Sequence, residues 1–287
     1  MKILRFDGGE GPRIGVVVGS DAAGVVDLSR RGLAFSNVLD VIEGGEEARR
    51  AIVRAAKGGA THRLDEVKLL APIVRPGKYL AIGMNYKKHV EEAARIGVPA
   101  ATHQVWFNKQ TSCITGPYDI ISPGVTQKLD YEVELGVVIG TAAKSVSAQR
   151  AKSHIFGYFV ANDVSARDWQ FHSPTFTVGK SFDTHGPIGP WIVTADEVPD
   201  PHALDLRCFV NGELRQASNT REMIHDIFQQ ITYLSTAFTL EPGDLLATGT
   251  PEGVGIGRVP PKFLQSGDVV RCEIDGIGVI ENRVAAD

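Results

Sequence analysis

The sequence predicts a mixed β protein with few helices, in which a small N-terminal α+β domain precedes a larger, β-rich domain. Its 287 residues suit a small domain followed by a large one. Short β-like runs separated by Gly and Pro turns recur over most of the chain. They are too many for one flat sheet and do not alternate with helices, so we expect a rolled or sandwiched sheet with helices at its margins.

The N-terminal domain is expected to cover residues 1–71. Its β-like runs occupy residues 2–6, 14–18 and 24–27, and a helical pattern follows over residues 46–57. Pro72, Pro76 and Gly77 then interrupt regular structure, which places the domain boundary at this point.

The second domain is expected to cover residues 72–287 and to contain most of the strands. These are predicted at residues 78–82, 132–139, 155–162, 191–194, 205–210, 244–247, 269–274 and 278–282. Two helices are predicted among them, at residues 89–95 and 220–236.

Composition narrows the function classes. The formal net charge of -4 gives no strong field for phosphate backbones or anionic lipid, so neither nucleic acid nor a membrane is expected as a partner. No signal-peptide pattern and no stretch of about 20 apolar residues is present, which predicts a cytoplasmic protein. Cys113, Cys208 and Cys272 lie far apart without a C-x-x-C pair, and we expect small buried side chains rather than disulfides or zinc ligands.

Three carboxylates form the strongest candidate site. Val133, Leu135, Val137 and Ile139 alternate along one strand, so Glu132 and Glu134 share the opposite face. The next predicted strand ends at Asp163, where a third carboxylate would converge. Oxygen ligands without clustered His or Cys indicate Mg²⁺ or Mn²⁺ first and Ca²⁺ second. The alternative is a pair of solvated glutamates on an edge strand.

His89 and Glu92 lie three residues apart on one face of a predicted helix. A glutamate that accepts from the imidazole makes the distal ring nitrogen a better base, able to take a proton from water or from a carbon beside a carbonyl. The alternative is a routine charged pair at an exposed helix start.

Lys109 and Lys180 lie in apolar or glycine-rich segments, where an unpaired ammonium is costly. Each is expected to meet an anion, either a substrate carboxylate or a developing enolate. The alternative for each is a solvated surface lysine.

Five motifs, taken in order, resemble the fumarylacetoacetate hydrolase family over roughly residues 72–284. They are Gly83-Met84-Asn85-Tyr86 followed by His89 and Glu92, the Glu132-x-Glu134 strand, Asn162-Asp163-Val164-Ser165-Ala166-Arg167-Asp168, Gly179-Lys180-Ser181-Phe182-Asp183, and Thr248-Gly249-Thr250-Pro251. The resemblance implies a β-roll catalytic domain, usually dimeric, with a magnesium ion.

The resemblance also implies roles for particular residues. Glu132, Glu134 and Asp163 match the metal ligands, and His89 and Glu92 match a dyad on a lid over the substrate. Lys180 matches the lysine that faces the metal-bound oxyanion. The residues predicted to bind substrate are Asn85, Tyr86, Lys109, Arg167, Gln170 and Thr250. One departure is visible: some branches carry arginine where this chain has Met84, which removes a carboxylate clamp.

The leading hypothesis for function is a metal-dependent hydrolase that cleaves a carbon–carbon bond in small 2,4-dioxo carboxylic acids. The metal and Lys180 would stabilise an enolate while His89, assisted by Glu92, activates water. One alternative is an isomerase, tautomerase or decarboxylase that acts on 2-oxo or 2-hydroxymuconate-type diacids, including oxaloacetate. A second alternative is a non-catalytic protein that binds a metal or ligand, against which the intact dyad and lysine argue. In either enzyme the partner is a small oxo-carboxylate, and a homodimer is expected.

Overall fold

The computed structural model describes residues 1–19, 23–95 and 97–286. The N-terminal part holds five strands and two α-helices among these residues. The elements are β1 (Lys2–Asp7), β2 (Pro12–Val18), β3 (Gly24–Asp27), η1 (Ser29–Arg31), α1 (Val38–Glu43), α2 (Gly45–Ala56), β4 (His62–Arg63), η2 (Leu64–Glu66) and β5 (Lys68–Leu70). Residues 71–78 then contain neither helix nor strand.

The larger part is mostly strands. Its first half contains β6 (Tyr79–Gly83), α3 (Lys87–Arg95), β7 (Val105–Asn108), η3 (Thr111–Cys113), β8 (Ile114–Thr115), β9 (Leu129–Asp130), β10 (Val133–Ile139), α4 (Ala148–Ala151), η4 (Lys152–His154), β11 (Ile155–Asn162), β12 (Ser165–Ala166) and α5 (Arg167–Gln170). Its second half contains β13 (Gly186–Thr194), η5 (Ala195–Glu197), β14 (Asp205–Val210), β15 (Glu213–Asn219), η6 (Thr220–Glu222), α6 (Ile227–Ala237), β16 (Leu245–Ala247), η7 (Gly255–Gly257), β17 (Val269–Ile274) and β18 (Gly278–Arg283).

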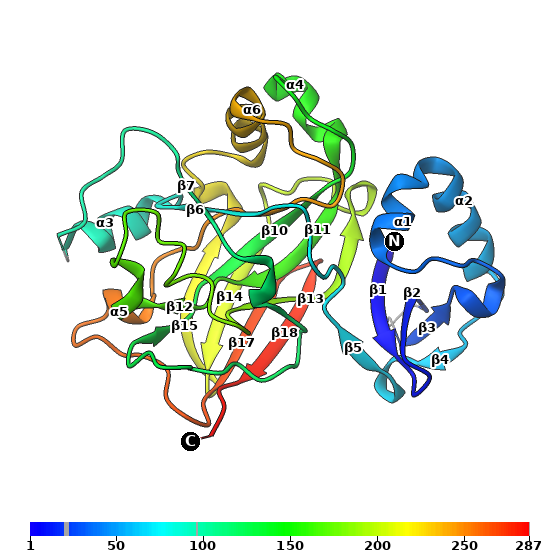
Figure 1. Cartoon of the computed structure of the whole chain (residues 1–287), viewed down its shortest axis with the longest axis horizontal. Coiled ribbons are helices and arrows are strands. Elements are labelled where there is room, and N and C mark those ends of the chain that lie inside the picture. The colour runs from blue at the N-terminus through cyan, green and yellow to red at the C-terminus, as the bar shows by residue number, and fades with distance from the viewer. Residues whose placement is uncertain (20–22, 96, 287) are drawn as a thin grey trace.

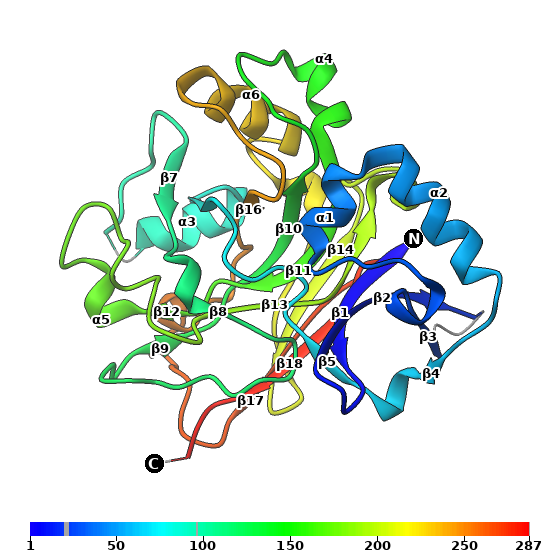
Figure 2. The same ribbon diagram turned by 45° about the vertical axis from the view of Figure 1, so that its right-hand side comes forward.

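One large sheet runs through both parts of the molecule. Its strand order is β4-β3-β2-β1-β13-β11-β10-β16-β6-β7, with β5 beside β1 and β8 beside β13. The link between the parts is the antiparallel pair β1–β13, in which Lys2 lies opposite Val193 and Ile3 opposite Ile192. Figures 1 and 2 show the N-terminal strands (blue) extending the sheet of the larger part, with α1 and α2 beside them.

A second sheet, of order β15-β14-β17-β18, packs on one face of the large sheet. The core between the two sheets contains the alternating residues of β10 that the sequence predicted: Val133, Leu135, Val137 and Ile139. Val138 points the other way, into a second core that includes residues of α1 and α2. The predicted sandwich of sheets with marginal helices is thereby confirmed.

The solvated-edge alternative for Glu132 and Glu134 is wrong. β10 lies between β11 and β16 in the middle of the large sheet, and the side chains of both glutamates are buried. Their charges therefore need compensation from within the protein or from a bound ion.

Some predicted element bounds are wrong for identifiable reasons. The helix predicted at 220–236 begins at Ile227, because Asp226 and Gln229 form a capping box there. The strand β15 was not predicted, although the turn before it has Asn211 and Gly212 in left-handed conformation, as Asn-Gly hairpins do. β13 begins five residues before the predicted start at 191, since Gly189 and Pro190 obscured the strand pattern.

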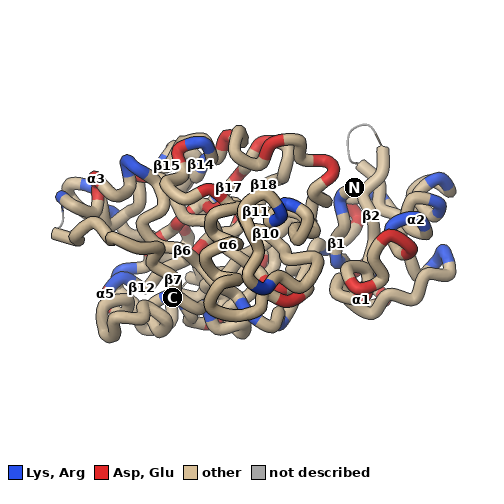
Figure 3. The backbone as a smooth tube through the Cα atoms, turned by 90° about the horizontal axis from the view of Figure 1, so that it is seen from above, with Lys and Arg blue, Asp and Glu red and all other residues tan. Residues whose placement is uncertain are grey.

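Lys and Arg are interspersed with Asp and Glu along the molecule (Figure 3), in keeping with the small net charge. Among the described residues, no helix combines the length and hydropathy needed to cross a bilayer. Cys113, Cys208 and Cys272 are buried free thiols, as predicted.

Candidate active site

Three buried carboxylates from two neighbouring strands meet at one end of the large sheet. Glu132 directly precedes β10, Glu134 is its second residue, and Asp163 follows the last residue of β11. The strand ends are adjacent because the Asp163 amide donates to the Glu132 carbonyl at 2.9 Å. One oxygen of each carboxylate lies within 4.8 Å of the others. Among the described residues, this is the single cluster of three or more ligating side chains close enough to hold a metal ion.

Three cationic side chains surround this carboxylate cluster. Lys180 Nζ lies 2.7 Å from both Glu132 Oε2 and Asp163 Oδ2. Arg167 donates to Glu132 Oε1 at 2.6 Å, and Lys109 donates to Asp163 Oδ1. Burial raises the pKa of Glu132, but the charges of Lys180 and Arg167 outweigh burial and lower that pKa to about 2. Glu132 is therefore an anion at neutral pH.

Glu134 is the carboxylate that a metal would compensate. Of the cationic side chains described, none bonds to it; its Oε2 accepts a hydrogen bond from the Gly249 amide at 2.8 Å. Burial and the charges of Asp163 and Glu132 hold the pKa of Glu134 well above its usual value. A divalent cation between the three carboxylates would remove this repulsion, and an all-oxygen donor set suits a hard ion. The residues present therefore fit a divalent metal site.

The predicted dyad forms on α3. His89 Nδ1 lies 3.1 Å from Glu92 Oε2. Because a carboxylate only accepts hydrogen bonds, Nδ1 carries the proton and Nε2 is left as the basic nitrogen. The other oxygen of Glu92 accepts from the Gly253 amide at 3.0 Å, which fixes the carboxylate in place. This pair has the arrangement of a general base.

One cavity is lined by the dyad and by two of the three carboxylates, Glu132 and Glu134. Its interior offers about 90 Å³ to small molecules, several times the roughly 10–15 Å³ that one water needs by the same measure. Eight of the predicted site residues line it: His89, Glu92, Glu132, Glu134, Arg167, Gln170, Lys180 and Thr250. Asp163 is buried behind the wall, bonded to Lys180.

Arg167, Gln170 and Thr250 have most of their polar groups engaged. Arg167 Nη1 donates to Gln170 Oε1 at 2.9 Å, which leaves the Gln170 amide nitrogen as the donor for the cavity. The Thr250 hydroxyl donates to the Val133 carbonyl at 3.0 Å, so its proton is committed to the strand.

The structure does not bring Asn85 and Tyr86 to the cavity, and their predicted substrate contact is corrected to a packing role. The Asn85 amide bonds to the backbone of His225 and Thr248 at 2.8–3.0 Å, so its polar atoms are engaged. Tyr86 is fully buried in the main core. Neither lines the cavity, and both join separate segments of the larger part.

The predicted substrate contact of Lys109 is also corrected. Its ammonium is buried and donates to Asp163 and to the Lys180 carbonyl. The anion that compensates this lysine is therefore a carboxylate of the protein. Lys109 holds Asp163 and does not line the cavity.

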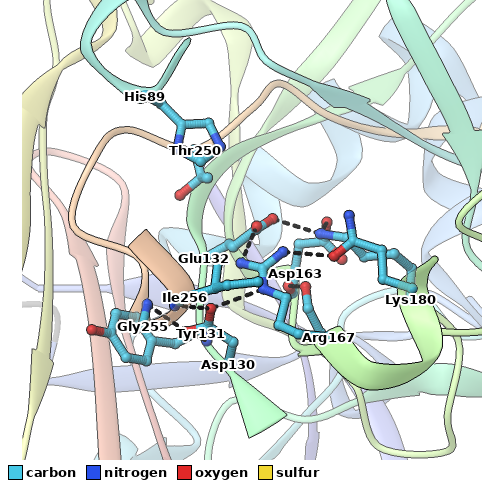
Figure 4. Close-up of polar contacts among 12 residues, drawn as sticks. His89, Asp130, Tyr131, Glu132, Asp163, Arg167, Lys180, Thr250, Gly255 and Ile256 are labelled. Carbon is cyan, nitrogen blue, oxygen red and sulfur yellow. Dashed lines mark hydrogen bonds and ion pairs between the residues drawn. The ribbon is translucent and has the colours of Figure 1, made fainter. Parts of the chain in front are cut away.

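Asp130 is a site residue that the sequence analysis missed. Its carboxylate accepts from Arg167 Nε at 2.8 Å and from the amides of Gly255 and Ile256 at 2.7 and 3.0 Å. Figure 4 shows the resulting chain from the η7 segment through Asp130 and Arg167 to Glu132. Asp130 lies two residues before Glu132 and so continues the alternation that indicated Glu132 and Glu134. The sequence therefore contained a pattern that could have predicted it.

Comparison with known proteins identifies the family. The family description "Fumarylacetoacetate (FAA) hydrolase C-terminal" matches residues 78–285, and "Rv2993c-like, N-terminal" matches residues 1–72. The chain belongs to the fumarylacetoacetate hydrolase family. It is therefore related to enzymes that act on oxo acids, and the resemblance inferred from its motifs is confirmed.

Relatives of this fumarylacetoacetate hydrolase family member span the whole chain. It is 44% identical to the mitochondrial oxaloacetate tautomerase FAHD2B of Bos taurus, over 99% of this chain and 91% of the relative. The fumarylacetoacetate hydrolase of Exiguobacterium antarcticum is 38% identical, with a TM-score of 0.85 and 100% of both chains covered. The maleylpyruvate hydrolase of Sphingobium sp. SYK-6, solved with manganese(II) and pyruvate, is 34% identical, with a TM-score of 0.83 over 100% of this chain and 99% of that chain.

Proposed function

We propose that the protein is a divalent-metal-dependent hydrolase that cleaves a carbon–carbon bond in small 2,4-dioxo carboxylic acids of the acylpyruvate type. The observation that carries this proposal is one cavity lined by the His89–Glu92 dyad and by Glu132 and Glu134, two of the three carboxylates that fit a metal. A base and an electrophilic centre on one small cavity suit chemistry at a carbonyl group.

His89 has the central role in the proposed reaction. Its Nε2 takes a proton from water while Glu92 holds Nδ1, and the water oxygen adds to the C4 carbonyl of the substrate. The C3–C4 bond breaks, its electron pair remains on C3 as the enolate of pyruvate, and the imidazolium returns a proton to C3. One water is consumed, and pyruvate and a carboxylic acid are released. Lys180 places a positive charge beside the carboxylate cluster, where it stabilises the negative charge that develops on the substrate.

Glu132, Glu134 and Asp163 would hold the metal. When bound, a divalent ion would polarise the oxygens of the 2-oxo acid as a Lewis acid. We propose Mg²⁺ or Mn²⁺ as the native ion, with Ca²⁺ as the weaker alternative. The manganese and pyruvate in the Sphingobium enzyme support both the ion class and the substrate class.

Keto–enol tautomerisation of oxaloacetate is the second candidate. It is favoured by the Bos taurus tautomerase, which matches 99% of this chain. The same base would move a proton between C3 and the C2 oxygen without breaking a carbon–carbon bond.

Product analysis separates the candidates. Purified protein loaded with Mg²⁺ or Mn²⁺ is incubated with acetylpyruvate, with oxaloacetate and with a 2-hydroxymuconate-type diacid, and products are followed by NMR. Acetate and pyruvate in equal amounts from acetylpyruvate support the hydrolase. Deuterium exchange or enol decay without cleavage supports the tautomerase, and release of CO₂ would identify a decarboxylase; either result alone would overturn the hydrolase proposal.

The base assignment is tested separately. His89→Gln is expected to lower kcat by about 10²- to 10⁴-fold, the usual contribution of a positioned acid–base group, with metal affinity unchanged. His103→Gln, at an exposed histidine, is the matched control. Full turnover by His89→Gln would show that another group is the base.

A homodimer and a cytoplasmic location also remain proposals. The free, buried state of all three cysteines is compatible with a reducing compartment. Light scattering on the purified protein would measure the mass against 30.9 kDa for one chain.

A further inference from the structure

Three phenylalanines line the cavity in a continuous series. The ring centroids of Phe107 and Phe176 lie 6.1 Å apart at an interplanar angle of 73°, and those of Phe176 and Phe171 lie 5.9 Å apart at 83°. These are edge-to-face contacts, which aromatic pairs favour. The mechanism described above uses none of these rings. We call Phe107, Phe176 and Phe171 the aromatic series.

The aromatic series leads from the carboxylate cluster to the surface. Lys180 Nζ lies 5.1 Å from the Phe107 ring, so the inner end touches the residue that bridges Glu132 and Asp163. Phe107 is 6% exposed, Phe176 is intermediate and Phe171 is 57% exposed. A substrate whose 2-oxo acid group lies at the carboxylates would therefore extend its other end along these rings.

Two of the lining residues adopt a costly backbone conformation. Met84 and Phe176 have φ values of +60° and +59°, in the left-handed region that bulky residues rarely occupy. Such conformations are unfavourable and persist where the surroundings determine them, often at functional sites. The ring contacts on both sides of Phe176 supply such surroundings.

The cations of the cavity wall are already engaged. Among the described lining residues, Arg167 and Lys180 are the Lys and Arg side chains, and both bond to Glu132. His89 is bonded to Glu92. Apart from the Gln170 amide, a second carboxylate on the substrate would thus face Met84, the aromatic series and further apolar side chains: Ala93, Val98, Val254 and Ile256. Burying an unpaired carboxylate against such a wall is unfavourable.

We infer that the aromatic series and Met84 form a subsite for an apolar acyl substituent, so that the preferred substrates are acylpyruvates with an aryl or alkyl tail rather than diacids. This assignment rests on the proposed function, since it orients the substrate by placing its 2-oxo acid group at the metal site. It deepens that function by specifying the part of the substrate that the catalytic residues do not contact.

The experiment compares three substrates that share the pyruvate end and differ in the tail: acetylpyruvate, benzoylpyruvate and succinylpyruvate, which ends in a carboxylate. The metal-loaded enzyme is expected to show a kcat/KM for benzoylpyruvate at least tenfold above that for succinylpyruvate. Binding is measured in parallel by calorimetry on the His89→Gln protein, so that affinity is compared even if turnover is slow.

Phe171→Ala tests the subsite directly, because its side chain is exposed and its loss is compatible with folding. It is expected to lower kcat/KM for benzoylpyruvate about tenfold and to change acetylpyruvate less than twofold. Phe238→Ala removes another exposed phenylalanine, away from the cavity, and should leave both values unchanged. Met84→Arg adds a cation to the wall and is expected to shift the preference towards succinylpyruvate.

The outcomes separate this inference from the proposed function. The subsite proposal is overturned, and the hydrolase proposal stands, if acetylpyruvate is cleaved but kcat/KM is the same for all three substrates. The same conclusion follows if Phe171→Ala lowers kcat/KM equally for all three. If no substrate is cleaved, the hydrolase fails, and the calorimetric preference for benzoylpyruvate over succinylpyruvate still decides the subsite.

Discussion

Gly257 lies directly against the side chain of Glu92. A Cβ atom on Gly257 would fall 2.3 Å from Glu92 Cδ and 2.5 Å from Oε1, closer than atoms can approach. The absence of a side chain at Gly257 therefore lets η7 support the carboxylate that orients His89. Since Glu92 is also bonded to Gly253 and His89, it has little freedom to move aside.

Gly257→Ala is accordingly expected to displace Glu92 and to lower kcat by about tenfold to a hundredfold, as small misplacements of a catalytic group do. Affinity for Mg²⁺ or Mn²⁺, measured by calorimetry, should change little. Gly267→Ala is the control: its backbone is left-handed but an added Cβ meets nothing within 4 Å, so it should cost some stability and no activity. Wild-type kcat in Gly257→Ala would contradict the role of this contact.

Asp130→Asn is expected to weaken both stability and metal binding. The substitution removes the charge that pairs with Arg167 inside the protein, and breaking a buried ion pair typically costs about 3–5 kcal/mol. Thermal unfolding and metal titration would measure the two effects. Asp65→Asn breaks an exposed pair with Arg63, for which at most about 1 kcal/mol is expected. Equal effects of the two substitutions would show that burial of the Asp130 pair is unimportant.

Lys109→Met should destabilise the metal-free protein more than the metal-loaded protein. The substitution removes one of the two lysines that compensate Asp163, and a divalent ion would supply the missing positive charge. Melting curves with and without saturating Mn²⁺ test this, with a larger metal-induced rise in Tm expected for the variant than for the wild type. The same rise in both proteins would argue against Asp163 as a ligand.

His185 should make the protein less stable in acid. Burial lowers the pKa of this histidine to about 4 from an ordinary value of 6.5, and its Nε2 donates to the Ser122 carbonyl. The pKa of His185 is lower in the folded protein than in the unfolded chain. The contribution of neutral His185 to the free energy of unfolding is therefore complete above pH 6.5 and is lost as the pH falls towards 4. At roughly 1.4 kcal/mol per pH unit, the loss is of the order of 3 kcal/mol.

Denaturant unfolding at a series of pH values checks the His185 prediction. His185→Gln retains a donor for the Ser122 carbonyl. Between pH 7 and pH 4 its free energy of unfolding should fall by about 3 kcal/mol less than that of the wild type. His103→Gln controls for the loss of a histidine as such. Parallel pH curves for wild type and His185→Gln would contradict the prediction.

Local patterns in the sequence, together with the ordered motifs, predicted the cluster of three carboxylates. The period of two placed Glu132 and Glu134 on one face, and the end of the next strand placed Asp163. The partners of these carboxylates could not be predicted in the same way, because Lys109 lies 54 residues from Asp163 and Arg167 lies 35 residues from Glu132. Such pairs depend on tertiary packing, which no local period describes.

Motif membership was an imperfect guide to substrate contact. Asn85 and Tyr86 belong to the same motif as His89, yet they are buried and do not line the cavity, whereas Met84 beside them does. A motif records which residues occur together but not which way each side chain points. The aromatic series was missed for a related reason: Phe107 lies on β7 and Phe171 and Phe176 in a loop, and no spacing connects them.

The pairing of β1 with β13 has a consequence for any attempt to isolate the larger part of the chain. Removing the first 70 or so residues would leave the backbone groups of Ile192 and Val193 without their ladder partners and strip the apolar covering from Ile188 and Ile192. An open strand edge of this kind recruits strands from other molecules. The truncated protein is therefore expected to self-associate, so the N-terminal residues protect the sheet that carries Glu132, Glu134 and Asp163 from aggregation.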